Sequence, residues 1–394
     1  MKIALDYTTG IYPGAGIARY TRSLVGALAE LDAENSYRLF YAARGLPRPT
    51  PETRQAAALF RRHPNFRPAR VPVSVREMFA LWQRLRAPVP VDLFTGRIDL
   101  LHSPDFVSPP HIGGKDVITV HDLSFMVVPE CAEPKLAAFL GKAVPRAVRR
   151  ADHIIAVSRQ TRDDLVRLLD VPPSKVTVAY NGVDERFVPG ASPGKAADLR
   201  KSLGLPGRFI LHIGTLEPRK NLARLVEAYG LLLKRAEAGD GSSLRDVGLV
   251  LAGRRGWLYE PVLAAAEGVN AAGGRVVLVD FVRDDDLPTL YNLADGFAYP
   301  SLYEGFGLPA AEAMACGVPT LVSRDGALAE VVGDAALKVD AHSVEAIAGG
   351  LEKLLADEGL RRRLSDAGPG QVSRFTWQAA ARTVLDVYKG LVAS

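Results

Sequence analysis

The chain has 394 residues, of which 48% are apolar and 24% charged, with a net charge of +5 and two cysteines. A chain of this length exceeds what one hydrophobic core supports, so we expect two folded domains. The composition excludes disordered, collagen-like and disulfide-rich proteins, and two cysteines are too few for a cysteine zinc site.

The basic excess lies in the first half, because residues 1–190 hold 26 Lys and Arg against 19 Asp and Glu. Such a surface attracts phosphate-bearing substrates, nucleic acid or an anionic membrane. No basic ribbon with interleaved aromatic residues is present, which argues against nucleic acid. No apolar stretch reaches the ~18 residues of a membrane span and no secretory signal is evident, so we expect a cytoplasmic protein.

The first half alternates short apolar strands with helical or loop segments, the pattern of a parallel sheet covered on both faces. Strands are predicted at KIALDY, YRLFYA, DLLHSP, VITVHDL, HIIAVS and VTVAYNGV. After the first strand, "TGIYPGAGIARYTR" places Gly10, Gly14 and Gly16 before a helix. Backbone amides there can receive a phosphate, although a tight connection is the simpler explanation and the third glycine of a dinucleotide fingerprint is missing.

"VITVHDLSF" puts His121 and Asp122 at the carboxyl end of a strand. A single histidine in this position is either structural or a contact to a ligand. Neither a second histidine at metal-binding spacing nor a nucleophile motif accompanies it, so the sequence predicts no metal site.

A Pro- and Gly-rich stretch, residues 186–199, separates the halves, and we predict domains at 1–190 and 191–375. In the second half, strands are predicted at RFILHIG, VGLVLAG, VVLVDFV, GFAYPS and PTLVS. The predicted fold is therefore α/β, with two doubly wound, Rossmann-like domains. Such sheets bind ligands at the carboxyl ends of their strands, and a cleft between the domains is the expected site.

"GTLEPRKN" places Arg219 and Lys220 at the predicted start of a helix. Two cations in a first helical turn oppose the helix dipole unless an anion balances them, which suggests a pyrophosphate. A solvated basic turn is the alternative.

"YEGFGLPAAEAMACGVPT", residues 303–320, sets a glycine-rich turn between Glu304 and Glu312. Pro309 predicts that a helix begins at Leu308. Both glutamates can then face one pocket, where helix amides suit phosphate oxygens and a carboxylate suits the paired hydroxyls of ribose.

Together these segments resemble the family 4 retaining glycosyltransferases of the GT-B fold, over essentially the whole chain, with E-x7-E as the most specific element. The "GIARYTR" form is most similar to the mannosyltransferase branch that builds lipopolysaccharide or other surface glycans. The resemblance implies that a hexose, plausibly mannose from GDP-mannose, moves to a glycan or lipid-linked acceptor. It also implies that residues 1–190 form the acceptor-side domain and residues 191–375 the nucleotide-sugar-binding domain. It implies no cofactor and no metal.

The resemblance also implies residue roles. Glu312 would bind the ribose and Glu304 the donor sugar, while Arg219 and Lys220 would neutralise the leaving diphosphate and His121 would contact the sugar near its reacting carbon. The other implied donor-binding residues are Gly14, Gly16, Gly214, Val282, Arg283, Gly305, Phe306, Gly307 and Leu308.

Two helices could extend this function. The resemblance implies that a last helix, residues 376–394, crosses back onto the first domain. "VREMFALWQRLR", residues 75–86, either packs in the core or docks on an anionic membrane as a peripheral contact. Two other functions stay open, a nucleotide-sugar 2-epimerase of the same fold and a nucleotide-sugar-binding protein without catalysis.

Overall fold

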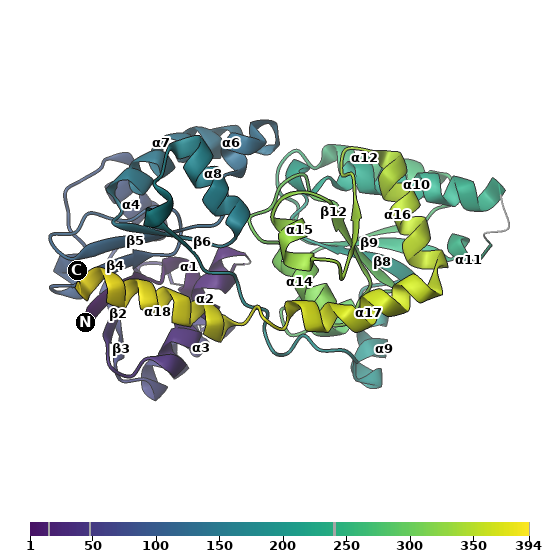
Figure 1. The fold of residues 1–394 in the computed structure, drawn as a ribbon. Helices are drawn as coiled ribbons and strands as arrows, with labels where there is room; N and C mark the ends of the chain where they lie inside the picture. Colours follow the sequence, from purple (N-terminus) through teal and green to yellow (C-terminus); the bar gives the residue numbers. More distant parts are fainter. Residues whose placement is uncertain (15, 47–48, 239–241, 394) are drawn as a thin grey trace. The chain divides into compact units, whose positions relative to one another are not determined.

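The computed structural model describes residues 1–14, 16–46, 49–238 and 242–393, and contacts between Cα atoms divide it into two units. The N-terminal unit comprises Met1–Leu123, Ala138–Gly182 and Phe375–Ser394; the C-terminal unit comprises Ser124–Ala137 and Val183–Arg374. Figure 1 shows both, coloured along the sequence. The segment from Ser124 to Ala137 was not expected in the C-terminal unit, but Trp257 Nε1 of that unit donates to the Cys131 carbonyl at 2.8 Å.

The N-terminal unit has a seven-stranded parallel sheet in the order β3-β2-β1-β4-β5-β6-β7. Its strands are β1 (Lys2–Asp6), β2 (Ser36–Ala42), β3 (Phe66–Val71), β4 (Leu100–Ser103), β5 (Lys115–Val120), β6 (His153–Ala156) and β7 (Val176–Val178). The predicted strands are confirmed, whereas β3 was missed. Its sequence FRPARV is polar and contains a proline, which an edge strand tolerates because only one side is paired.

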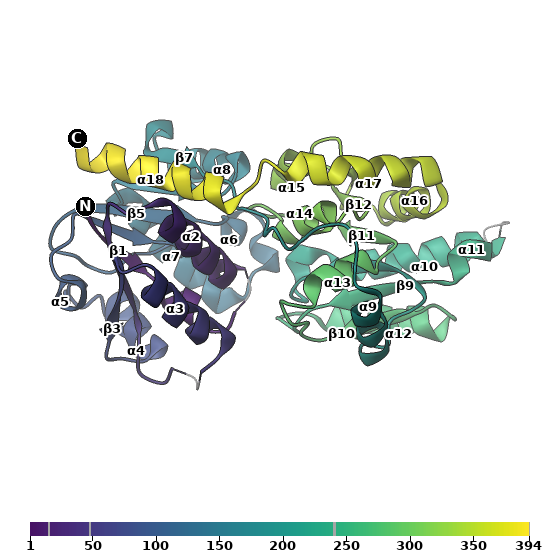
Figure 2. The same ribbon diagram turned by 90° about the horizontal axis from the view of Figure 1, so that it is seen from below.

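Helices cover both faces of this sheet. They are α1 (Thr8–Ile11), α2 (Ile17–Leu31), α3 (Pro51–Arg62), α4 (Val75–Phe79), the π-helix η1 (Ala80–Arg84), α5 (Asp92–Thr95), α7 (Pro134–Arg150), α8 (Arg159–Leu169), the 3₁₀ turn η3 (Pro173–Lys175) and α18 (Trp377–Ala393). The last helix, α18, runs alongside α2 in both views (Figures 1 and 2). Its Tyr388 hydroxyl lies 2.5 Å from Nδ1 of the buried His102 on β4.

The segment 75–86 divides its side chains between core and solvent. Met78 and Trp82 are 8% and 6% exposed and pack against β1, β2 and β4. In contrast, Phe79 and Leu85 are 45% and 72% exposed. Core packing therefore orders this segment while it presents apolar side chains to solvent. Within the described ranges, no helix is both long enough and apolar enough to span a bilayer.

The C-terminal unit has a six-stranded parallel sheet in the order β10-β9-β8-β11-β12-β13. Its strands are β8 (Arg208–Ile213), β9 (Val247–Ala252), β10 (Val276–Val279), β11 (Gly296–Tyr299), β12 (Thr320–Ser323) and β13 (Leu337–Val339). The predicted strands are again confirmed, and the missed one, β13, is a three-residue edge strand. The predicted fold of two doubly wound α/β domains is confirmed.

The main core of this unit lies between the sheet and α10, α12 and α16, with apolar side chains that are almost wholly buried. Its helices are α6 (Ser124–Val127), η2 (Pro129–Cys131), α9 (Pro193–Ser202), η4 (Pro218–Lys220), α10 (Leu222–Ala238), α11 (Ser242–Arg245), α12 (Glu260–Ala271), α13 (Leu287–Asn292), α14 (Leu308–Ala315), α15 (Gly326–Val332), α16 (Val344–Ala356) and α17 (Glu358–Val372). Since β8 and β11 are neighbours but not consecutive, the strand order reverses between them, where α/β sheets bind ligands.

Candidate functional site

The segments after β8 and β11 meet at this reversal point through a buried ion network. Lys220 Nζ lies 2.6 Å from Oε1 of Glu304, and Arg219 Nη1 lies 2.9 Å from Oε2 of the same carboxylate. Arg219 Nη2 also contacts Oε1 of Glu217 at 2.7 Å. The network thus joins two cations to two carboxylates, and Glu217, Lys220 and Glu304 are all less than a tenth exposed.

Lys220 retains one donor hydrogen beyond its two hydrogen bonds in the described structure. Its ammonium group donates to Glu304 and, at 2.6 Å, to the Tyr299 hydroxyl on β11. An ammonium carries three N–H groups. Lys220 is only 8% exposed, so this third N–H has little contact with solvent.

The network sets the charge states of its members. Burial alone raises the pKa of Glu304, but Arg219 and Lys220 lower it more, to about 2. Burial lowers the pKa of Lys220, and Arg219 lowers it further, whereas Glu304 raises it. Glu304 is therefore ionised at neutral pH, and a carboxylate in that state accepts hydrogen bonds from hydroxyl groups.

Arg219 and Lys220 were predicted at the start of a helix, and the structure places them in a 3₁₀ turn just before α10. Both lie in the 3₁₀ turn η4, and α10 begins at Leu222 after Asn221 in the left-handed region, φ 61°. The Asn221 side chain donates to the Pro300 and Ala341 carbonyls at 3.0 and 2.6 Å. The balancing anions that the pattern required are supplied within the chain, by Glu217 and Glu304.

Glu312 lies in the second turn of α14, which begins at Leu308 as predicted. Gly307 caps this helix with φ 92°, a conformation that favours glycine, and a Cβ there would lie 2.3 Å from Leu328. The Glu312 side chain is 1% exposed, and its Oε2 accepts a hydrogen bond from Tyr291 at 3.0 Å. Glu304 and Glu312 therefore have different partners.

The remaining residues of the "EGFG" segment line the same edge of the sheet. Gly305, Phe306 and Gly307 are buried, while Leu308 is partly exposed. Phe306 is 3% exposed, so its ring is a core side chain.

Gly214 follows β8 and packs closely against the next loop. A Cβ on Gly253 would lie 1.9 Å from the Gly214 carbonyl, so the two loops touch through backbone atoms. Beneath Gly214, His212 donates from Nδ1 to the Ala298 carbonyl at 2.9 Å, and its buried Nε2 has no hydrogen-bond partner in the described structure. Burial lowers the pKa of His212 to about 4, so the ring is neutral.

Val282 and Arg283 lie in the loop after β10, at the same edge of the sheet. Val282 is 9% exposed, whereas the Arg283 side chain is 77% exposed and its nearest acid, Asp285, is 4.0 Å away. The structure thus leaves Arg283 open to solvent.

In the N-terminal unit, His121 follows β5 and is fixed by its surroundings. Its Nε2 donates to the Pro104 carbonyl at 2.8 Å, and its ring packs edge-on against Tyr20, with centroids 4.7 Å apart. Burial lowers the pKa of His121 below its ordinary 6.5. With Nε2 protonated, the neutral ring presents Nδ1 as an acceptor.

Gly14 and Gly16 flank residue 15, which lies outside the described residues. Gly16 is the N-cap of α2 with φ 54°. The Arg22 guanidinium donates to the carbonyls of Gly10, Tyr12 and Gly14 at 3.5, 3.4 and 3.1 Å. Because Arg22 belongs to α2, these bonds tie the three residues to that helix.

Sequence reasoning missed several of these partners. Glu217 stands beside Arg219 in "GTLEPRKN" and could have been recognised from that spacing, and Arg22 ends the quoted "GIARYTR". Tyr291 gave no local signal, because its contact with Glu312 bridges separate segments.

The comparisons with known proteins cover both units. The family Glycosyltransferase Family 4 matches residues 14–187, and Glycosyl transferases group 1 matches residues 196–371. O-antigen chain mannosyltransferase B of Escherichia coli is 31% identical over 393 residues, which are 99% of this chain and 100% of that protein. The chain belongs to glycosyltransferase family 4.

Two further matches bear on this family 4 glycosyltransferase. The serotype-specific mannosyltransferase WbdA of Escherichia coli is 32% identical over 284 residues, 71% of this chain but only 34% of that protein. The solved structure of sucrose-phosphate synthase from Thermosynechococcus elongatus has a TM-score of 0.74 at 22% identity and covers 100% of this chain and 99% of that one. That likeness supports the GT-B fold.

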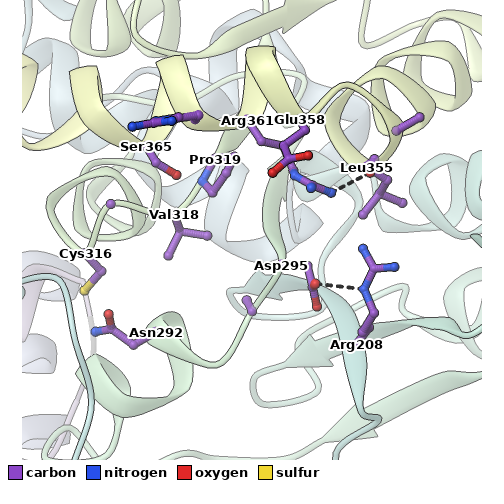
Figure 3. A pocket seen from close by; sticks show the side chains of 14 residues that line it. Arg208, Asn292, Asp295, Cys316, Val318, Pro319, Leu355, Glu358, Arg361 and Ser365 are labelled. Atoms are coloured by element: carbon purple, nitrogen blue, oxygen red, sulfur yellow. Dashed lines mark hydrogen bonds and ion pairs between the residues drawn. The ribbon is translucent and has the colours of Figure 1, made fainter. Parts of the chain in front are cut away.

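A separate pocket of about 930 Å³ lies at the opposite edge of the C-terminal sheet of this glycosyltransferase (Figure 3). Arg208 begins β8, and Asp295 and Pro319 directly precede β11 and β12, so the pocket is at the amino ends of the strands. Arg208 and Asp295 form an ion pair of 3.0 Å within it. The residues that line this pocket are not among the predicted site residues.

Proposed function

We propose that this family 4 glycosyltransferase is a retaining hexosyltransferase that transfers mannose from GDP-mannose to a glycan or lipid-linked acceptor during surface polysaccharide synthesis. The observation that carries the proposal is the buried network of Arg219, Lys220 and Glu304 at the reversal point of the C-terminal sheet. The full-length likeness to an O-antigen chain mannosyltransferase supports mannose as the sugar and a surface glycan as the product.

Each member of the network has a part in this reaction. The third N–H of Lys220 binds a phosphate oxygen of the donor, and Arg219 beside it adds positive charge as the diphosphate leaves. Glu304, held ionised, accepts hydrogen bonds from hydroxyls of the donor sugar. Glu312, with one oxygen fixed by Tyr291, binds the ribose.

Transition-state stabilisation then rests on positioned charge rather than on a metal ion. His121 of the N-terminal unit, neutral and fixed through Nε2, accepts from the transferred sugar through Nδ1. The proposal includes retention of the anomeric configuration, independence from a metal ion, and guanine as the base of the donor nucleotide.

A peripheral membrane contact fits a lipid-linked acceptor. The segment 75–86 exposes Val75, Phe79 and Leu85, and it also contains three arginines. Apolar side chains next to basic ones suit an anionic bilayer surface. This contact belongs to the proposal, and no nucleic-acid partner does.

The test uses the full chain with GDP-, UDP-, ADP- and dTDP-hexoses in the presence of EDTA. Calorimetry measures binding, and nucleotide release measures slow donor hydrolysis. We expect GDP-mannose to bind most tightly, and Glu312→Ala to weaken binding at least about tenfold because a charged hydrogen bond is lost. Glu352→Gln, a change at a half-exposed surface glutamate of the same unit, serves as the control.

Product analysis completes the test. Proton–carbon coupling at the anomeric centre of the glycoside product distinguishes retention from inversion. Interconversion of the hexose without transfer would favour an epimerase instead. Unchanged binding in Glu312→Ala would remove the donor-site assignment.

A further inference from the structure

The ammonium group of Lys220 has a second partner besides Glu304. Its Nζ donates to the Tyr299 hydroxyl at 2.6 Å and lies 5.0 Å from the centroid of that ring. Tyr299 is the last residue of β11, the strand beside β8 at the reversal point of the sheet. It is 1% exposed, so its side chain is enclosed by the protein rather than open to a ligand. An effect of Tyr299 on the reaction must therefore pass through a neighbouring side chain, and its hydroxyl contacts Lys220.

The Tyr299 ring belongs to a cluster of three aromatic side chains. His212 of β8 stacks on it, with centroids 5.1 Å apart and an interplanar angle of 13°. Phe297, two residues earlier on β11, lies 5.8 Å from it at 19°. His212 is itself fixed, because its Nδ1 donates to the Ala298 carbonyl at 2.9 Å. All three rings are buried and close-packed, so the Tyr299 hydroxyl is held in one place.

Two acceptors fix the direction of the remaining N–H group of Lys220. The Glu304 carboxylate and the Tyr299 hydroxyl take one N–H each, both at 2.6 Å. The three N–H groups of an ammonium are tetrahedrally arranged, so two fixed bonds determine where the third points. With Glu304 alone, the ammonium could turn about its Cε–Nζ bond and swing around the carboxylate. Tyr299 removes that freedom.

The two acceptors differ in charge. Glu304 is ionised and offsets the positive charge of Lys220. Burial, and then the charge of Glu304, raises the pKa of Tyr299 well above its ordinary value of 10, so its hydroxyl is neutral at neutral pH. Tyr299 thus orients the ammonium without adding a negative charge that would weaken its attraction for an anion.

The stem of Lys220 is confined from the side of the loop after β8. A Cβ on Gly214 would lie 3.6 Å from Cε of Lys220 and 3.1 Å from Nε2 of His212, so this backbone packs closely over both side chains. The lysine is therefore held along its length as well as at its charged end.

We propose that Tyr299 is a positioning residue that aims the third N–H group of Lys220 at the leaving diphosphate of the donor. The inference rests on the proposed function, which assigns the diphosphate to Lys220. It adds a residue that neither the predicted site residues nor the ion network include. A donor that is aimed in advance stabilises charge as a bond breaks, and a misaimed one loses this effect although it keeps its charge. The effect of Tyr299 should therefore appear in kcat more than in donor binding.

The experiment measures release of nucleotide from GDP-mannose, with and without methyl α-mannoside as a probe acceptor. It compares the full chain with Tyr299→Phe, Lys220→Met and the double variant. We expect Tyr299→Phe to lower kcat about tenfold and to raise KM by no more than about threefold, because the ammonium remains but its direction is lost. Lys220→Met should lower kcat about a hundredfold, as removal of one positioned donor does. In the Lys220→Met background, Tyr299→Phe should change kcat by less than about twofold.

The double variant separates positioning from a structural role. A tyrosine that only stabilised the fold would slow both backgrounds by the same factor. Tyr229→Phe is the matched control, because its hydroxyl is also buried and donates to the Val247 carbonyl at 2.8 Å. This control should lose stability and keep its kcat.

Each outcome decides the proposal. Unchanged kcat in Tyr299→Phe, or equal losses in the two backgrounds, overturns it, while the proposed function stands as long as Lys220→Met is slow. A raised KM with unchanged kcat also overturns it, because Tyr299 would then act in ground-state binding. If Lys220→Met does not slow release, or if the full chain binds GDP-mannose but releases nucleotide under neither condition, the proposed role of Lys220 is refuted and this inference with it.

A second variant guards against a folding defect in Tyr299→Phe. Tyr299→p-aminophenylalanine keeps the ring and puts a nitrogen in place of the hydroxyl oxygen, but the nitrogen lone pair is delocalised into the ring and accepts more weakly. Where Tyr299→Phe folds, we expect the amino variant to have an intermediate kcat, which is a partial rescue. Where it does not fold, a lowered kcat that disappears in the Lys220→Met background supports the proposal, and a kcat equal to that of the unsubstituted protein overturns it.

Discussion

Lys220 and Glu304 form a buried ion pair of 2.6 Å although they stand 84 positions apart in the chain. The pair connects the segment after β8 to the segment after β11, so it stabilises the edge of the sheet as well as the proposed donor site. Removing one partner from a buried pair leaves an uncompensated charge, which costs about 3–5 kcal/mol.

A double-mutant cycle tests this coupling. We expect Lys220→Met and Glu304→Gln each to lower the free energy of unfolding, and the double variant to lose less than the sum, with a coupling energy of about 1–3 kcal/mol. Urea unfolding measures all four proteins. Additive losses would mean that the two side chains stabilise the fold independently, contrary to the geometry.

The same pair gives the protein a pH-dependent stability in acid. The pKa of Glu304 is about 2 in the folded state and 4.5 in its ordinary state, so the folded protein holds this proton less tightly. The stabilisation is fully present above about pH 4.5 and is lost as the pH falls towards 2. Glu304→Gln should remove that part of the acid dependence, which melting temperatures measured from pH 2 to 7 will show. An identical profile in the variant would contradict the assignment.

The strands that the sequence predicted and those that it missed differ in their surroundings. Central strands such as β8 and β9 are buried on both faces, so their sequences are continuous apolar runs that stand out. The missed β3 and β13 are edge strands. An edge strand has fewer apolar contacts and admits charged residues and proline, so its pattern resembles that of a loop.

The candidate site was predictable where its residues belong to short motifs. Lys220 and Glu304 each stand in a recognisable segment, yet neither segment indicates that the two side chains pair. The hydrogen bond from Tyr291 to Glu312 was missed for the same reason, because it joins residues of two separate segments. Contacts of this kind follow from sheet topology, which local patterns do not contain.

Tyr291 and Glu312 provide a test of the ribose assignment. Tyr291→Phe removes the hydroxyl that donates to Glu312 at 3.0 Å and leaves a buried carboxylate with one donor fewer. We expect a loss of about 1–3 kcal/mol in unfolding free energy and weaker binding of GDP-mannose. Calorimetry and thermal unfolding measure the two effects.

The matched control for this change is Tyr229→Phe. Its hydroxyl donates to the Val247 carbonyl at 2.8 Å within the core of the same unit. Stability should fall in this variant while GDP-mannose affinity stays unchanged. If both tyrosine variants changed the affinity equally, the effect of Tyr291 would be one of general stability, and the ribose assignment of Glu312 would lose its support.

Gly253 gives the last prediction, since it separates packing at the donor site from backbone flexibility. A Cβ at this position would lie 1.9 Å from the Gly214 carbonyl, which is backbone and cannot rotate away. Gly253→Ala must therefore displace the loop after β8 that leads to Arg219 and Lys220, so we expect weaker GDP-mannose binding and lower stability.

Gly268, inside α12, is the matched site, because a Cβ there would meet no heavy atom of the described residues within 4 Å beyond its own helix backbone. There, Gly268→Ala should stabilise the protein by about 0.5–1 kcal/mol, because alanine is the better helix former, and leave donor affinity unchanged. Unaltered donor binding in Gly253→Ala would show that the loop after β8 can shift without consequence for the donor, and the role proposed for Lys220 would then have to be abandoned.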